Sequence, residues 1–102
     1  MSQLIRVASI GDIPVGTGKE LMAGDRIVAV FNVDGQLHAL DGICPHAGGP
    51  LGEGALRGTT VTCPWHGWQF DVVTGKHCLN ARITHGVFPV VVQGDEVFVE
   101  IP

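Results

Sequence analysis

The feature that most restricts how this chain can fold is a pair of short segments, each of which combines one Cys with one His. Cys44 and His46 are separated by one residue, and Cys63 and His66 are separated by two. Sixteen residues lie between the two pairs, a Pro follows each Cys, and small residues follow each His. Thiolates and imidazoles are metal ligands. The pattern therefore predicts that the fold brings two distant loops together around one metal centre.

Alternating apolar and polar residues predict β-strands at both ends of the chain. The segments DRIVAVFNV and QLHALD are joined by Asp34-Gly35, a pair typical of tight hairpin turns. FPVVVQGDEVFVEI predicts a second hairpin with its turn at Gly94-Asp95, and LIRVASI predicts a first strand. No segment keeps a helical period over more than about two turns, and residues 16–24 hold at most one short helical turn. We therefore expect an all-β fold.

The middle of the chain differs from the two ends. Residues 42–82 are rich in Gly, Pro and His and contain all three Cys. We expect a single domain over residues 1–102, in which an antiparallel β base (about 1–41 and 83–102) carries this segment as an inserted cluster-binding subdomain.

Composition and charge exclude several functions. The formal net charge is −4 with only six Lys and Arg, which argues against nucleic-acid binding. No apolar run is long enough to cross a membrane, and the first residues do not resemble a signal peptide. An odd number of Cys argues against a disulfide framework and favours a reducing compartment. We expect a soluble cytoplasmic protein whose acidic surface suits a protein partner with a basic docking face.

Two kinds of metal centre fit two Cys and two His. A structural zinc site uses this set, but common zinc-finger spacing pairs Cys with Cys and His with His along the chain. Here each loop contains one of each. A mixed loop suits a centre in which two irons share sulfides and each loop gives one ligand to each iron. The spacing therefore favours an iron–sulfur cluster, with structural zinc as the alternative.

The run from VAVFNVDGQLHALDG through CPHAGGP to CPWHGWQFDVVTGK resembles the Rieske [2Fe–2S] family, in particular the soluble ferredoxins of bacterial aromatic-ring-hydroxylating dioxygenases. The resemblance implies a Rieske-like β-sandwich or barrel that holds one [2Fe–2S] cluster. It also implies that Cys44 and Cys63 bind one iron, and that His46 and His66 bind the other.

The same resemblance implies a function. Such a chain would be a one-electron carrier, not an enzyme by itself, that takes electrons from a flavin-dependent ferredoxin reductase. It would pass them to a terminal oxygenase in the breakdown of aromatic hydrocarbons. The small subunit of an assimilatory nitrite reductase, which has a similar Rieske-like chain, is the alternative function.

Departures from the respiratory members of the family predict a low reduction potential. Those proteins resemble this chain at the ligands but add a disulfide between the loops, and here Trp65 occupies the second-loop position. They also carry hydroxyl side chains after the second His, whereas this chain has Gly67-Trp68-Gln69-Phe70. Fewer hydrogen bonds to sulfur predict a potential near the low end of about −150 to +300 mV. Deprotonation of iron-bound imidazole should lower the potential only at alkaline pH.

The resemblance gives no ligand role to the third Cys or to the other three His. We expect Cys78 to be a small buried or half-buried residue. His38, His77 and His85 are expected to be ordinary surface or turn residues, with His77 as a neighbour of the cluster in a less favoured alternative.

Two Trp and two acidic residues lie near the predicted loops. Trp65 and Trp68 are expected to pack around the cluster, although Trp65 could instead lie at a docking rim, where aromatic residues are enriched. Glu53 is expected to be a solvated turn residue. Asp71 could stabilise either a turn or the second loop.

Overall fold

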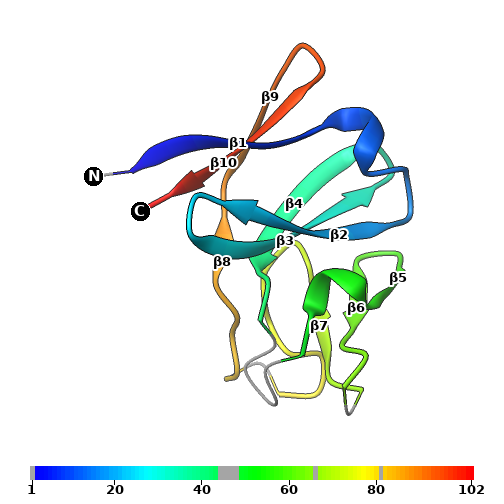
Figure 1. Ribbon diagram of the computed structural model, residues 1–102. Coiled ribbons are helices and arrows are strands. Elements are labelled where there is room, and N and C mark those ends of the chain that lie inside the picture. The colour runs from blue at the N-terminus through cyan, green and yellow to red at the C-terminus, as the bar shows by residue number, and fades with distance from the viewer. Residues whose placement is uncertain (1, 44–48, 66, 81) are drawn as a thin grey trace.

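The computed structural model describes residues 2–43, 49–65, 67–80 and 82–102, and these form three antiparallel sheets (Figure 1). The first sheet has the order β1 (Gln3–Ser9), β10 (Glu96–Ile101), β9 (Val90–Gln93). The second has the order β2 (Gly18–Ala23), β3 (Arg26–Val33), β4 (Gln36–Asp41), β8 (Val87–Phe88). The third has the order β5 (Ala55–Arg57), β6 (Thr60–Thr62), β7 (Gln69–Asp71). The two helical segments are short 3-10 turns, η1 (Ile10–Asp12) and η2 (Leu51–Glu53).

The predicted all-β class is confirmed, as are both hairpins. Asp34 and Gly35 have φ values of 51° and 93°, which the tight turn between β3 and β4 requires. The β9–β10 hairpin turns at Gly94, with φ 61°. Among the described residues, no helix is long and apolar enough to cross a membrane.

Residues 16–24 contain no helix, which agrees with the expectation of at most one short helical turn, but the sequence did not predict that most of this segment is strand β2. Residues 18–23 pair in continuous register with β3, from Gly18 opposite Phe31 to Ala23 opposite Arg26. The sequence GKELMA lacks the β-branched residues that mark strands, so its pairing with β3 decides its conformation.

Strand β3 serves two hydrophobic cores, because its alternating side chains point to opposite faces of the sheet. Val28 and Val30 belong to a core formed between the two base sheets. Ala29 and Phe31 belong to a second core, which also contains Cys63 and Phe70. The sheet β5–β6–β7 is therefore packed against the base through the opposite face of the same strand (Figure 1).

Asn32 is a buried polar residue that should contribute measurably to stability. Its Nδ2 donates to the carbonyl oxygen of Ile13 at 2.8 Å, and its Oδ1 accepts from the backbone N–H of Gly35 at 2.8 Å. Asn32→Ala should lower the free energy of unfolding by about 1–3 kcal/mol, because both backbone groups lose their partner. Urea denaturation measures this. Asn80→Ala removes an exposed side-chain bond and should cost less; equal losses would contradict the prediction.

Candidate metal centre

Cys63 is the predicted ligand that the structure describes; Cys44, His46 and His66 lie outside the described residues. Cys63 directly follows β6 and is only 1% exposed. Its backbone N–H donates to the carbonyl oxygen of Trp68 at 2.7 Å, which closes the second loop between β6 and β7. The thiol is thus held at the end of a short hairpin, inside the core.

The two ends of the first loop are held side by side. Ile43 and Pro50 form an isolated antiparallel bridge, and the backbone N–H of Leu51 donates to Gly42 at 3.0 Å. The carboxylate of Asp41 accepts from the backbone N–H of Ile43 at 3.1 Å. These contacts hold the end of β4 next to the start of η2, so the two ends of the first loop lie side by side.

The two loops meet at Gly49. A Cβ atom built on Gly49 would lie 3.0 Å from Cys63 Sγ and 2.9 Å from Trp65 Cγ, closer than ordinary van der Waals contact. The thiol of the second loop thus lies directly against the end of the first loop. A buried thiol at this meeting point, with a Cys and a His in the remainder of the first loop, fits the donors of a Rieske-type cluster. Among the described residues alone, no three His, Cys, Asp or Glu side chains gather as a metal site.

Gly49→Ala should reduce cluster occupancy, because the added methyl group would push apart Cys63 and Trp65. Iron and acid-labile sulfide per chain, together with visible absorbance, measure the effect. Gly11→Ala is the matched control, since a Cβ at Gly11 would meet nothing within 4 Å. Full iron content in the Gly49 variant would mean that this contact does not constrain the site.

A layer of aromatic and imidazole rings supports the second loop. The ring of His77 lies edge-on to two aromatic rings. Its centroid is 4.7 Å from that of Trp68 and 5.3 Å from that of Phe70. His77 is only 8% exposed, and its Nδ1 accepts from the backbone N–H of Leu79 at 3.0 Å. The prediction of an ordinary surface or turn residue was therefore wrong for His77, which lies beneath the loop that carries Cys63.

His85 connects this layer to the first loop. Its Nε2 lies 2.7 Å from the carbonyl oxygen of Asp41 and therefore carries the proton that it donates. Its ring centroid is 5.5 Å from that of Phe70. His38 is half-buried on β4 and makes no contact with this layer among the described interactions. Sequence patterns missed these roles because each depends on contacts between residues far apart in the chain.

Cys78 and Trp65 are both more exposed than predicted. The Cys78 side chain is exposed, and its backbone N–H donates to the carbonyl oxygen of Gln69 on β7. Trp65 packs against Gly49 at the meeting point of the loops, as expected, but it is 51% exposed, which also agrees with the alternative position at a rim. Trp68 is partly buried against the core, as predicted.

The structure tests the predictions for Glu53 and Asp71 through the exposure of the first and the hydrogen bonds of the second. Glu53 is exposed in η2, as expected for a solvated residue. Asp71 stabilises a turn: its Oδ1 accepts from the backbone N–H groups of Val73 and Thr74 at 2.8 and 3.2 Å. Among the residues that the structure describes, the Asp71 side chain bonds to this turn and to Thr59 rather than to the second loop.

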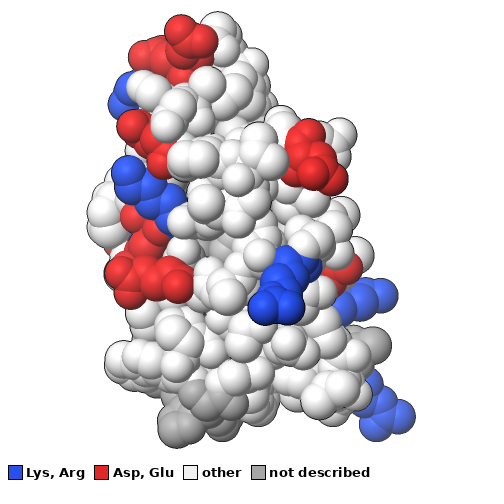
Figure 2. Space-filling model, turned by 90° about the vertical axis from the view of Figure 1, so that its right-hand side faces the viewer, with Lys and Arg blue, Asp and Glu red and all other residues white. Residues whose placement is uncertain are grey.

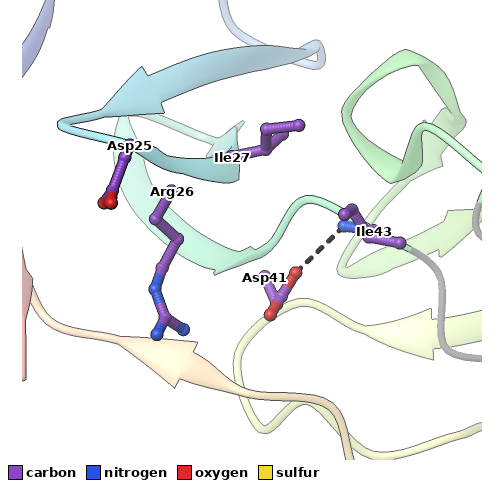
Figure 3. A pocket seen from close by; sticks show the side chains of 5 residues that line it. All are labelled: Asp25, Arg26, Ile27, Asp41 and Ile43. Carbon is purple, nitrogen blue, oxygen red and sulfur yellow. Dashed lines mark hydrogen bonds between the residues drawn. The ribbon is translucent and has the colours of Figure 1, made fainter.

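An open pocket of about 470 Å³ lies where the base meets the first loop (Figure 3). Its lining residues are Asp25, Arg26, Ile27, Asp41 and Ile43. Arg26 lies over the ring of Phe88, 5.4 Å from its centroid, and Asp41 already accepts a bond from Ile43. Cys63 is not among the residues that line this pocket.

The end of the molecule that carries the loops is nearly uncharged. Residues 42–52 and 63–70 contain no Lys, Arg, Asp or Glu, and most acidic residues belong to the base. On the face shown in Figure 2, white surface surrounds the grey atoms at the lower end, and the charged side chains nearest to them are Lys or Arg. Ile43 and Trp65 are exposed at this end. Such a surface suits contact with another protein.

Comparisons with known proteins agree with this geometry. A family model described as "Rieske [2Fe-2S] domain" matches residues 3–90. The chain is 33% identical over 100 residues to the 3-phenylpropionate/cinnamic acid dioxygenase ferredoxin subunit of Shigella flexneri, covering 96% of this chain and 93% of that protein.

Two solved structures are similar over nearly the whole chain. One is a chain from the complex of reduced oxygenase and oxidized ferredoxin in carbazole 1,9a-dioxygenase, with 34% identity, a TM-score of 0.84, and coverage of 94% of this chain and 91% of that chain. The other, from Mycobacterium tuberculosis, is described as a small subunit of NADH-dependent nitrite reductase. It has a TM-score of 0.87 and covers 100% of this chain and 97% of that chain, but its 22% identity supports only a shared fold.

Proposed function

Because the chain belongs to the Rieske [2Fe–2S] domain family, we propose that it carries single electrons from a flavin-dependent ferredoxin reductase to the terminal oxygenase of an aromatic-ring dioxygenase system. The observation that carries this proposal is the similarity, over almost the full length of both chains, to a dioxygenase ferredoxin subunit. That relative is named as an electron-transfer component, which agrees with the prediction that this chain is not an enzyme by itself.

The proposed ligands are Cys44, His46, Cys63 and His66, within a single domain whose cluster-binding part covers about residues 42–82. When bound, a [2Fe–2S] cluster supplies reversible one-electron transfer. Cys63 supports this assignment because its thiol is buried where the two loops meet. Membership of the family favours iron over the zinc alternative.

The described residues supply the surroundings of the cluster. Phe70 and His77 fix the second loop from beneath, and the bond between His85 and Asp41 ties the first loop to the same layer. Trp65 presents an apolar, half-exposed surface at the rim. These groups limit water near the site and leave an uncharged face for protein docking. We also propose a cytoplasmic location, because thiolate ligands and the exposed Cys78 suit a reducing compartment.

The proposal is tested by reconstitution. The purified protein, reduced without oxygen, is mixed with the terminal oxygenase of a 3-phenylpropionate or a carbazole dioxygenase and its aromatic substrate. O2 is then added, and the product formed per two electrons supplied is measured. At least one oxygenase should form its dihydroxylated product only when this protein is present. Failure with both, together with co-purification of a large haem-containing subunit from the native cells, would favour the nitrite reductase alternative instead.

The potential tests the ligand set separately. Protein-film voltammetry should give a one-electron wave within about −150 to +300 mV, because two imidazoles replace two thiolates. The wave should lie near the low end of this range, because few hydrogen bonds to sulfur are expected. The potential should be constant near neutral pH and fall at alkaline pH. A value near about −400 mV without pH dependence would indicate four thiolate ligands and contradict the assignment of His46 and His66.

A further inference from the structure

Leu79 is the most exposed of the large hydrophobic side chains that the structure describes, at 89%. Single exposed hydrophobic residues are common on protein surfaces and need no explanation by themselves. Leu79 differs because of how its backbone is held and where it lies.

The backbone around Leu79 is fixed on both sides. Its own N–H donates to Nδ1 of the buried His77 at 3.0 Å, and the preceding N–H, of Cys78, donates to Gln69 on β7 at 2.9 Å. After Leu79, the side chain and the carbonyl group of Asn80 accept bonds from the N–H groups of Arg82 and Ile83, at 3.1 and 3.0 Å. Hydrogen bonds therefore hold the described backbone on both sides of Leu79, whose apolar side chain is exposed to water.

The turn is continuous with the uncharged end of the molecule. His77 contacts Trp68, and the backbone N–H of Cys78 donates to Gln69, the first residue of β7, so the backbone at Leu79 is held next to the end of the second loop. Within residues 77–83, Arg82 carries the one permanent charge. The Arg82 side chain is exposed and has no ion-pair partner among the described residues. Leu79 and Arg82 are thus two exposed side chains, one apolar and one cationic, three residues apart in the chain.

We propose that Leu79 inserts into an apolar pocket on the terminal oxygenase, and that a carboxylate at the rim of this pocket pairs with Arg82. This inference rests on the proposed function. The chemistry of the partner follows from complementarity to Leu79 and Arg82, and the oxygenase is chosen because a similar chain was solved in a complex of oxygenase and ferredoxin. A side chain whose backbone is already held by hydrogen bonds loses little freedom on binding, which favours its use as an anchor.

The test compares four variants of the cluster-loaded protein: Leu79→Ser, Leu79→Met, Arg82→Gln and Leu4→Ser. Leu4 is a matched control, since it is 47% exposed on β1 in the base. The probe is whichever oxygenase of the carbazole and 3-phenylpropionate systems the wild-type protein reduces faster. Leu79→Ser should raise the KM for the ferredoxin by about tenfold or more. Leu79→Met should keep the KM near the wild-type value, and Leu4→Ser should leave the KM unchanged. Arg82→Gln should raise the KM less than Leu79→Ser does, and should weaken the dependence of the KM on salt.

The outcomes separate this inference from the proposed function. A higher KM in the oxygenase reaction, with the potential and the reduced-state EPR spectrum unchanged, supports it, whether or not reduction by the reductase also slows. An unchanged KM for Leu79→Ser would overturn it, as would a defect confined to the reductase reaction. Loss of self-association without any change in electron transfer would assign Leu79 to a contact between copies instead. Failure of the wild-type protein with both oxygenases would overturn the proposed function itself.

Discussion

Cys63→Ser and Cys63→Ala should abolish the iron–sulfur cluster, whereas Cys78→Ser should leave it intact. Cys63 is buried at the contact between the two loops, while Cys78 is an exposed thiol on a surface turn. The wild-type protein and Cys78→Ser should contain about two irons per chain, and the Cys63 variants almost none. Iron and sulfide analysis, visible absorbance and EPR of the reduced protein measure the difference.

The pair of Cys63 variants distinguishes ligation from packing. Alanine removes the ligand atom and nearly preserves the apolar character of the site, whereas serine keeps a weak oxygen ligand. If Cys63→Ala kept a full cluster with an unchanged EPR spectrum, Cys63 would be a core residue only. Loss of the cluster in Cys78→Ser would mean that the exposed thiol has a role that its position does not indicate.

Phe70→Ala should lower the free energy of unfolding by about 3–5 kcal/mol, because it leaves a cavity in the core beneath the second loop. Phe70 is fully buried on β7 and its ring contacts both His77 and His85. The variant should also lose iron faster to a chelator, since both loops depend on this layer. Denaturation followed by circular dichroism, and chelator kinetics followed by visible absorbance, give the two values.

Val73→Ala is the matched control for Phe70. Val73 is exposed just after β7, so its truncation should change stability by no more than about 0.5 kcal/mol. A similar small loss for Phe70→Ala would mean that the ring layer collapses onto the cavity. Unchanged release of iron despite lower stability would mean that Phe70 supports the fold but not the loops.

Local turn chemistry explains why much of the fold could be predicted. Asp34-Gly35 between two apolar runs determines a hairpin almost by itself, and the structure contains it. Strand β2 was missed because its residues have no intrinsic strand preference and are extended by pairing with β3. Predictions therefore succeeded where neighbouring residues decide the conformation and failed where a distant strand decides it.

For the candidate site, too, the predictions depend on whether neighbouring residues or distant contacts decide the outcome. The ligand types that we propose rest on the spacing of Cys and His, which the sequence displays directly. His77 is buried and the next residue, Cys78, is exposed. Their burial depends on how each residue packs beside β7, which the sequence does not display. The contact of Gly49 with Cys63 joins separate loops, so no local pattern could reveal it.

The separation of the two cores on either side of β3 has a consequence for maturation of the protein. Every buried residue of the core between the base sheets comes from outside residues 42–82. We therefore expect the base to fold before any iron is delivered, while the inserted segment is still open. In hydrogen exchange of the metal-free protein, the amides of β1 and β10 should stay protected, while those of β6 and β7 should exchange. An open inserted segment would give cluster-assembly proteins access to the thiols without unfolding of the base.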